Sequence, residues 1–503
     1  MNQKSFWQKD WLVGVLVALV FFFSANSDPM QSLERKAYDL GVLATSRVPS
    51  DKIAIIAIDA PSIANLGRWP WPRETHAKMI DLLAAGQAKV VAHTILFSEP
   101  QVDAGLVYIS KISGLLDQST LKNAANPSHR ADVEKLEGLL SEATRNLDND
   151  RKLSDSIAIA NNVLLAMYFE PGEPQGKPDH PLPGFVLRNQ LTNVKAGIGS
   201  SGLPDPSQGV LLPIPLIGVK AQAIGHLNFS RDVDGAVRTE PLVMGYYGQY
   251  FPSLSLMLAA KSLHLDAKDI QVSLGEGVKL GQQKITTDPT LRMYTYFYKD
   301  ANGRPAFTVD SFYDVLSGKI PAGKYRDKIV LIGASAAGVG TLQVTPIASS
   351  MPSVVTLAHS VSSILKGDFF VAPPWGGLAQ IGVFLLLALY LIGVLPRLSA
   401  AIGAVVTATL FVALLAAHFF LMRMQAMWLQ LMMPAALLLV GHLLLTTKRF
   451  LMTEQGKERS DAESAESNRM LGLAFQGQGH PERQAGFATL SGGEHQQIAG
   501  QTE

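Results

Sequence analysis

The 503-residue sequence contains no cysteine. Disulfide bonds, thiolate metal sites and cysteine nucleophiles are therefore excluded, although the absence leaves the redox compartment undetermined. Charged residues make up only 17% of the chain, and the formal net charge is +1. The sequence thus lacks the basic field that nucleic-acid-binding proteins usually carry, and no nucleic-acid partner is expected.

Hydrophobic residues are abundant, at 47% of the chain, and the excess lies in one short block near the start and three long blocks after residue 370. Residues 11–27 (WLVGVLVALVFFFSANS) carry no charge and follow Lys4 and Lys9. This run is just long enough to span a bilayer. A cleaved signal peptide is the alternative, but no clean small-x-small cleavage site follows, which favours an uncleaved anchor.

The three later blocks are uncharged apolar runs of spanning length. Lys4 and Lys9 precede the first span and Lys448 and Arg449 follow the last, so the positive-inside rule places both termini in the cytoplasm. We therefore expect a multi-pass membrane protein in contact with the lipid bilayer. The predicted order is a cytoplasmic N-terminus at 1–10, an anchor at 11–27, an extracytoplasmic (periplasmic) domain at 28–372, transmembrane helices at 376–395, 399–422 and 426–447, and a cytoplasmic tail at 448–503, partly helical and then disordered.

The domain at 28–372 has the pattern of an α/β fold, a mixed sheet with flanking helices. Apolar runs at 53–58, 89–97 and 328–333 have the composition of strands buried on both faces. A helical pattern at 74–85 separates the first two runs and indicates a βαβ unit. Residues 308–316 are also predicted to be helical. The expected fold class is therefore α/β, joined to an α-helical transmembrane bundle.

The motif Asp232-Val-Asp234-Gly235 predicts a tight turn between two strands. A calcium loop is excluded, because Pro241 stands where an EF-hand needs its bidentate glutamate. Arg238 is a suitable partner for Asp232 or Asp234. We interpret the two aspartates and the glycine as a structural turn.

Asp59 ends the first predicted strand, where α/β folds tend to place ligands, and the stiff segment RWPWPR follows at 68–73. Arginine presents a fork suited to carboxylate or phosphate, so a polar-ligand or anion site is one interpretation. The other is a structural latch, in which Asp59 pairs with an arginine and the tryptophans pack against the sheet; the latch is favoured. The ligand-binding candidates are Asp59, Arg68, Trp69, Trp71, Arg73, His76, His93 and Arg238.

The sequence lacks the tight ligand spacing of HExxH, the phosphate-binding GxxxxGK[ST] and the nucleophile motif GxSxG. No metal ion and no cofactor are therefore expected. Asp59, His76 and His93 leave open a membrane-tethered extracytoplasmic enzyme that uses them as acid–base groups. Because no catalytic motif is present, the favoured interpretation is that the chain is not itself an enzyme.

Four separated motifs occur in a fixed order: KIAIIAIDAPSIANLGRWPWPRETH at 52–76, ILFSEP at 95–100, GHLNFSRDVDGAVR at 225–238 and KIVLIGASAAG at 328–338. Together they resemble the CHASE2 extracytoplasmic sensor-domain family. The resemblance implies an N-terminal anchor, the sensor domain and three transmembrane helices ahead of a cytoplasmic output. In that family the output is a histidine kinase, a serine/threonine kinase or a nucleotide cyclase.

The resemblance implies a transmembrane signal-transduction sensor that detects an extracytoplasmic signal, a small molecule or a protein. Its cytoplasmic output is expected either to be truncated from this chain or to lie on a partner, which is a kinase, a cyclase or a repeat protein. The resemblance also implies that the membrane is a bacterial inner (plasma) membrane, and a homodimer is expected.

Overall fold

The computed structural model describes residues 10–123, 127–178, 180–196, 202–301 and 303–477. The predictions for residues 1–9 and for the end of the tail at 478–503 lie outside these ranges. The chain divides into two compact units. We name them the helical unit (Met1–Met30, Gly377–Ala416 and Gln430–Glu503) and the α/β unit (Gln31–Gly376 and Ala417–Leu429).

The α/β unit is built on a nine-stranded sheet with the order β14-β1-β15-β2-β3-β5-β8-β9, and β6 pairs with β3. Six of its strands, β14, β1, β15, β2, β3 and β6, pair in parallel, so their carboxyl ends meet at one edge. The strands are β1 Ile53–Ile58, β2 Val90–His93, β3 Val163–Pro171, β5 Pro206–Leu211, β6 Ala223–His226, β8 Val243–Tyr246, β9 Gln249–Pro252, β14 Thr308–Ser311 and β15 Ile329–Ala334.

The three apolar runs predicted as strands correspond to β1, β2 and β15, and every residue of these strands is buried. The second run was predicted as a strand over 89–97, but its strand covers only Val90–His93. The helix predicted between the first two is α4, Arg73–Ala85, which is preceded by a short helix, α3, Ala60–Leu66. The βαβ unit is therefore confirmed, although its two strands are not neighbours. β15 lies between them, with Ile332 paired to Ile56 on one side and to His93 on the other.

Each face of the sheet carries its own hydrophobic core, because side chains alternate along a strand. Ile53 and Ile55 of β1 belong to one core, which α10 (Leu254–Ser262) and α12 (Ser353–Lys366) cover. Ile56 belongs to the other core, which is covered by α4, α7 (Asn149–Ala160) and α11 (Phe312–Leu316). We call these the α12 face and the α4 face.

Smaller sheets extend the α12 side of the unit. A four-stranded sheet has the order β12-β11-β10-β4, a three-stranded sheet the order β18-β13-β7, and β16 pairs with β17. These strands are β4 Asn193–Lys195, β7 Thr239–Pro241, β10 Ile270–Ser273, β11 Gly277–Leu280, β12 Gln283–Thr286, β13 Arg292–Thr295, β16 Leu342–Thr345, β17 Ala348–Pro352 and β18 Phe369–Phe370.

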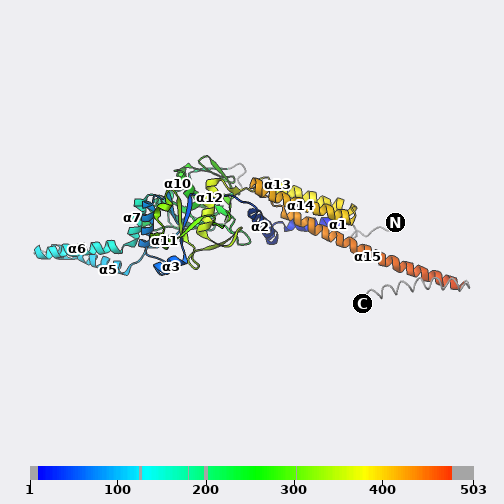
Figure 1. The fold of residues 1–503 in the computed structure, drawn as a ribbon, viewed down its shortest axis with the longest axis horizontal. Helices are drawn as coiled ribbons and strands as arrows, with labels where there is room; N and C mark the ends of the chain where they lie inside the picture. Colours follow the sequence, from blue (N-terminus) through cyan, green and yellow to red (C-terminus); the bar gives the residue numbers. More distant parts are fainter. Residues whose placement is uncertain (1–9, 124–126, 179, 197–201, 302, 478–503) are drawn as a thin grey trace. The chain divides into compact units, whose positions relative to one another are not determined.

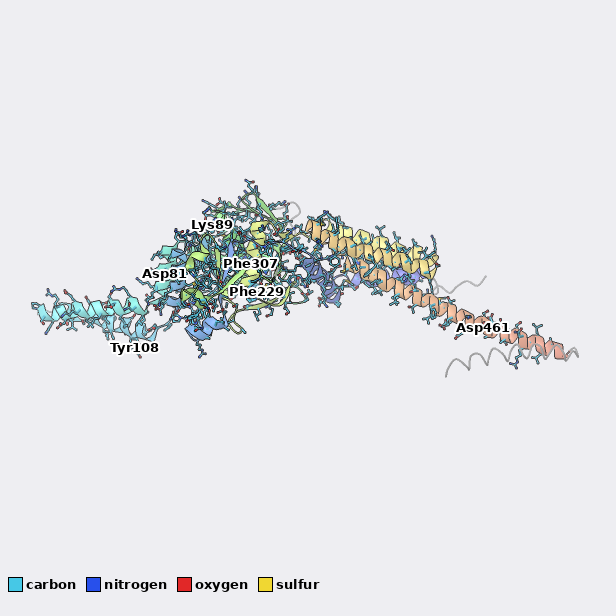
Figure 2. All side chains as sticks on the ribbon, viewed as in Figure 1. Asp81, Lys89, Tyr108, Phe229, Phe307 and Asp461 are labelled. Atoms are coloured by element: carbon cyan, nitrogen blue, oxygen red, sulfur yellow. The ribbon has the colours of Figure 1, made fainter. Side chains whose placement is uncertain are left out.

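Two further helices, α5 (Ala104–Gln118) and α6 (Pro127–Leu147), pack against each other as a hairpin (Figure 1). α6 has no buried residue, and Tyr108 of α5 is 66% exposed (Figure 2). The remaining elements of the unit are α2 (Asp28–Leu43), α8 (Gly184–Leu187) and α9 (Pro215–Gly218), with short 3₁₀ turns between strands.

Two local predictions are wrong. Residues 308–316 are not one helix, because Thr308–Ser311 forms β14, the edge strand paired to β1, before α11 begins. The turn at Gly235 exists, with φ of 81°, but the strands on either side of it do not form a hairpin. β6 pairs with β3 and β7 with β13, and a single bridge between Ser230 and Thr239 flanks the turn.

The helical unit contains α1 (Asp10–Ser24), α13 (Gly376–Leu389), α14 (Ala400–Gln425) and α15 (Met432–Gly477), although Ala417–Gln425 at the end of α14 belongs to the α/β unit. α13 continues through a π-helical turn, Tyr390–Val394. Within the described residues, three helices are long and apolar enough to cross a membrane, and there are up to four candidate spans if the bent pair α1 and α2 counts as one. The last span was predicted to start at residue 426, but its helix begins at Met432 and runs unbroken through the charged residues beyond 448 (Figure 1).

Candidate functional site

A pocket of about 230 Å³ lies where the parallel strands of the α/β unit end. The segments after β2 and β6 form one side, with Thr94 and Phe229 (Figure 2), and the first turn of α12 forms another. Glu240 of β7 and Gln343 of β16 complete the wall. In open α/β sheets ligands bind in the crevice outside the carboxyl ends of the strands, and this pocket has that position.

The close packing of α12 over the sheet edge depends on Gly333 of β15. A Cβ atom at this position would lie 2.7 Å from the Thr94 hydroxyl oxygen and 2.7 Å from Cβ of Val354. A side chain here would therefore push α12 away from the strand ends. The glycine brings the start of α12 onto the pocket wall.

Glu240 is the buried acid of the pocket, with 8% of its surface exposed. Its carboxylate accepts hydrogen bonds from the hydroxyl groups of Ser255 (2.7 Å) and Ser360 (3.2 Å). Burial raises the pKa of Glu240 to about 7, against the lowering effect of the two serine hydroxyl groups. Small changes in its surroundings can therefore shift the equilibrium between its charged and neutral forms.

Two further polar atoms in the pocket wall have unused hydrogen-bonding capacity. Gln343 and Thr356 are each 5% exposed, and within the described part of the chain Oε1 of Gln343 and Oγ1 of Thr356 have no hydrogen-bond partner. Buried polar atoms without a partner are rare in folded proteins. Their presence in one pocket indicates a site that is built to bind something polar.

The RWPWPR segment forms a latch on the α4 face. Trp71 is 2% exposed, donates its indole N–H to the carbonyl of Gly67 (3.0 Å) and packs on Phe312 at 5.0 Å between ring centroids. Arg73 forms an ion pair with Asp150 (3.4 Å). Trp69 rests edge-on against Trp71 at 5.1 Å, and Arg68 is exposed.

His76 and His93 are buried against each other in the same core. Nε2 of His93 lies 3.0 Å from Nδ1 of His76, and the backbone N–H of Ile95 donates to Nδ1 of His93 (3.3 Å). His93 therefore carries its proton on Nε2 and donates it to His76. Burial lowers the pKa of His76 to about 3, with a contribution from nearby Arg73, and lowers the pKa of His93 well below its usual range. Both rings are neutral at pH 7 and closed to solvent.

Asp59 does not join the two histidines. It caps the N-terminus of α3, accepting from the backbone N–H of Ser62 (2.9 Å), and it also accepts from the hydroxyl of Ser311 (2.9 Å) rather than from an arginine. Because β15 lies between β1 and β2, Asp59 is two strands, about 10 Å, from His93. The geometry gives the acid–base trio of a tethered enzyme no support.

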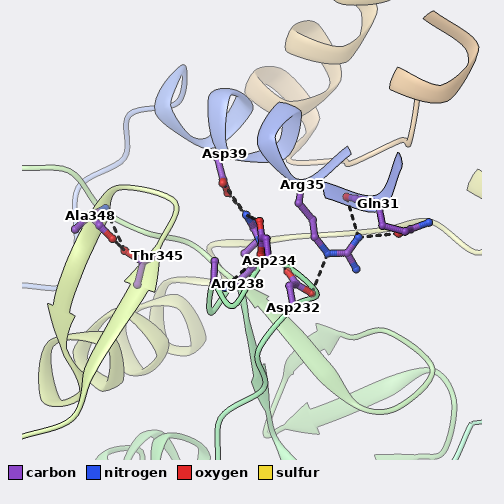
Figure 3. Close-up of polar contacts among 9 residues, drawn as sticks. Gln31, Arg35, Asp39, Asp232, Asp234, Arg238, Thr345 and Ala348 are labelled. Atoms are coloured by element: carbon purple, nitrogen blue, oxygen red, sulfur yellow. Dashed lines mark hydrogen bonds and ion pairs between the residues drawn. The ribbon is translucent and has the colours of Figure 1, made fainter. Parts of the chain in front are cut away.

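Arg238 is the centre of a charged cluster that holds α2 to the α/β core (Figure 3). It is 2% exposed and donates to Asp39 of α2 (2.7 Å), to Asp232 (2.9 Å) and to Asp234 (2.7 Å). Arg35 of α2 adds an ion pair with Asp232 (3.2 Å). We call this set the Arg238 cluster.

Arg238 and the carboxylates around it shift one another's pKa, and burial raises the pKa of Asp39 in spite of its hydrogen bond to Arg238. Burial alone lowers the pKa of Arg238, but hydrogen bonds to Asp39 and Asp234 more than offset it and raise the pKa above its ordinary value. The same hydrogen bonds lower the pKa of Asp234. Both predicted partners of Arg238 are present, and Asp39 is the partner that sequence reasoning missed. Arg238 thus acts as a clamp and does not line the pocket.

Sequence reasoning also missed the pocket. Glu240 stands in the run Thr-Glu-Pro-Leu-Val-Met directly after the motif at 225–238, and an acid amid apolar residues is a signal that could have found it. Gln343 and Thr356 carry no such signal. Among the described residues, no group of three or more histidine, aspartate or glutamate side chains is placed to hold a metal ion.

A parallel-stranded α/β domain with a pocket at its strand ends, flanked along the chain by candidate membrane helices, is the architecture of a membrane-anchored sensor domain. The CHASE2 domain family matches residues 13–395. This range covers most of the chain, so the protein belongs to the CHASE2 family, as the motifs indicated. No curated protein and no solved structure matches the chain.

Proposed function

We propose that this protein is a transmembrane signal-transduction sensor that detects an extracytoplasmic signal in the α/β unit and relays it through its membrane helices to a cytoplasmic output. A sensor needs two conformations that the signal binds with different affinity. It also needs a connection between the site where the signal binds and the helices that cross the membrane.

The observation that carries the proposal is the position of α12. Its first turn, Ser353–Leu357 in the sequence, lines the pocket, and its chain continues through β18 into α13, a candidate membrane span. A ligand that moves the start of α12 therefore acts on the segment that enters the membrane.

The Arg238 cluster supports a second connection. α2 follows α1 directly along the chain, and Arg238 ties α2 to the turn at Asp232 and Asp234. Tyr38 of α2 is fully buried in the α12-face core, where it packs against Trp428 with 5.1 Å between ring centroids. Both ends of the α/β unit thus lead, along the chain, into candidate membrane helices.

The absence of native cysteine allows a direct test, because a single introduced cysteine is the one thiol in the protein. We use Ser460→Cys, in the exposed charged half of α15, as the reporter in the full chain embedded in membranes. Ser353→Trp, which places an indole in the pocket wall, is expected to change the rate of maleimide labelling at this cysteine at least twofold.

Ser110→Trp, an equally large substitution on the exposed surface of α5, is the matched control and should leave the labelling rate unchanged. An unchanged rate with Ser353→Trp, in a protein that keeps its melting temperature, would refute transmission from the pocket to α15. Equal changes with both tryptophans would mean that the effect is not specific to the pocket.

A further inference from the structure

We propose that the pocket at the strand ends binds a small organic ammonium compound, its cationic group held by Glu240 and Gln343 and its apolar part held by the leucines of the wall. This inference rests on the proposed sensor function only for the role of the ligand, which would be the signal that the sensor detects. Binding itself can be measured independently of signalling.

The hydrogen-bonding groups of the pocket point to a donor-rich ligand. The carboxylate of Glu240 accepts one hydrogen bond on each oxygen and has capacity for more, and Oε1 of Gln343 is an acceptor without a partner in the described chain. The unpartnered hydroxyl of Thr356 can serve as a third acceptor. An ammonium group has three donors and no acceptor, which complements this set.

The charge of the pocket wall excludes ligands whose only charged group is an acid. Among the described residues that line the pocket there is no lysine, arginine or histidine, and Glu240 is the one carboxylate. Arg231, the basic residue that touches the wall, stacks 5.1 Å over the ring of Phe229 and is not part of the lining. A ligand whose only charge is negative would therefore meet a buried acid with no cation in the pocket lining to compensate it.

Size and polarity limit the rest of the ligand. The pocket encloses about 230 Å³, and Leu96, Leu227, Leu357 and the ring of Phe229 supply an apolar lining. Burial raises the pKa of Glu240 to about 7, so the carboxyl group is only partly ionised at pH 7, and a cation bound beside it favours the ionised form. The combination fits an ammonium group on a small hydrocarbon, whether that is an amine or an amino acid.

The test measures the affinity of four probes of similar shape for the full chain in lipid nanodiscs, by isothermal titration calorimetry. Phenethylamine carries the ammonium alone, phenylalanine the ammonium and a carboxylate, hydrocinnamate the carboxylate alone, and phenethyl alcohol neither. At least one ammonium probe should bind tenfold or more tightly than the alcohol and the acid. Preference for phenylalanine over phenethylamine would identify the amino acid as the source of the ammonium.

The site is located with matched variants. Glu240→Gln keeps the shape and one of the two serine hydrogen bonds, while the other serine hydroxyl must accept from the new amide N–H, and the variant should weaken the ammonium probe at least tenfold. Thr356→Val should weaken it about threefold and serves as an independent variant if Glu240→Gln is unstable. Glu170→Gln removes an exposed carboxylate from the same sheet outside the pocket and should leave binding unchanged.

The proposal is overturned if neither ammonium probe binds, if the alcohol or the acid binds as tightly, or if the ammonium affinity survives both pocket variants. Its failure can be told apart from failure of the sensor proposal. Ammonium binding that depends on Glu240, together with unchanged labelling of Ser460→Cys in the Ser353→Trp protein, would leave the ligand class standing and remove the relay. Failure of the ammonium probes to bind, together with a changed labelling rate in the Ser353→Trp protein, would leave the relay standing and refute the ammonium ligand.

Discussion

Among the described residues of the α/β unit, four histidines outside the candidate membrane helices are buried as neutral rings. Burial lowers the pKa of His76, His226 and His359 to about 3 and the pKa of His93 well below its usual range. His359 accepts a hydrogen bond from the backbone N–H of Tyr298 (3.1 Å). His226 is fully buried, and neither of its ring nitrogens has a partner within the described residues. The core therefore holds several bases that must stay uncharged.

These histidines make the protein sensitive to acid. The pKa of His76, His226 and His359 is about 6.5 in the unfolded chain and about 3 in the fold, so the unfolded chain binds more protons between these values and stability falls as the pH drops through this window. At pH 5 each of these three histidines costs about 2 kcal/mol relative to pH 8. His226→Leu should lessen the loss of stability between pH 8 and pH 5 by about that amount, measured by denaturation of the full chain in nanodiscs.

His129→Leu is the control for this measurement, because His129 lies exposed on α6. It should leave the pH dependence of stability unchanged. His226→Leu is also expected to be stable at pH 8, since replacing an unpartnered buried polar group by an apolar group is often neutral or stabilising. A His226→Leu protein as sensitive to acid as the parent would contradict the assignment of His226 as a buried neutral base.

At the scale of elements, α2 is the helix whose docking rests on polar contacts as much as on apolar ones. Tyr38 and Val42 are fully buried in the α12-face core. The ring nitrogen Nε2 of His418, from the end of α14, lies 2.9 Å from the carbonyl oxygen of Ala37. The Arg238 cluster adds three carboxylates around one buried guanidinium, so loss of Arg238 leaves those charges facing one another.

Arg238→Gln should therefore lower the free energy of unfolding by about 3 kcal/mol, the cost of breaking a buried ion pair. The matched control is Arg292→Gln, which breaks the pair with Asp205 (2.6 Å) but lies at a side chain that is 31% exposed. This pair should be worth about 1 kcal/mol or less. Equal losses from the two variants, measured by urea denaturation, would mean that Arg238 is not a special clamp.

The strands that could be predicted from the sequence are those whose own residues are sufficient to make them strands. β1 and β15 are apolar throughout and buried on both faces, so their composition is sufficient. β14, Thr308–Ser311, is a short polar strand that exists because β1 offers it an edge. The strands around Gly235 were misassigned because their partners, β3 and β13, lie elsewhere in the chain.

The same limit applies to the site. The RWPWPR loop attracts attention because its unusual residues are adjacent in the sequence, yet they form a latch on the α4 face. The pocket lies on the α12 face and joins Glu240, Gln343 and Thr356 from three separate elements. Glu240 and Ser360, which are hydrogen-bonded, are 120 residues apart. No local pattern encodes such a meeting, since it depends on the completed sheet.

At the scale of the whole molecule, the proposed arrangement across the membrane makes a prediction about sidedness. By the positive-inside rule, the positive residues beside the spans predict that α15 beyond Lys448 lies in the cytoplasm and that the α/β unit lies outside it. A membrane-impermeant maleimide added to intact cells stripped of any outer barrier should label Ser110→Cys on α5 and not Ser460→Cys on α15. Opened membrane vesicles should allow labelling of both.

Each of these variants is the internal control for the other, because both positions are exposed in the fold and no other thiol is present. Labelling of Ser460→Cys in sealed cells, with Ser110→Cys protected, would mean that the topology is the reverse of the one proposed. Labelling of both would place the two positions on one side. Either outcome would remove the basis for an extracytoplasmic sensor.

The central position of β15 has a consequence for how the protein is made. The backbone N–H of Thr94, just after β2, donates to the carbonyl of Ile332 in β15, 238 residues further along the chain. Until the ribosome has synthesised β15, β1 and β2 each have an unpaired edge and their apolar side chains lack a core. Such long-range pairing slows folding and exposes aggregation-prone strands. The newly made chain therefore needs protection by chaperones until most of the domain has been synthesised.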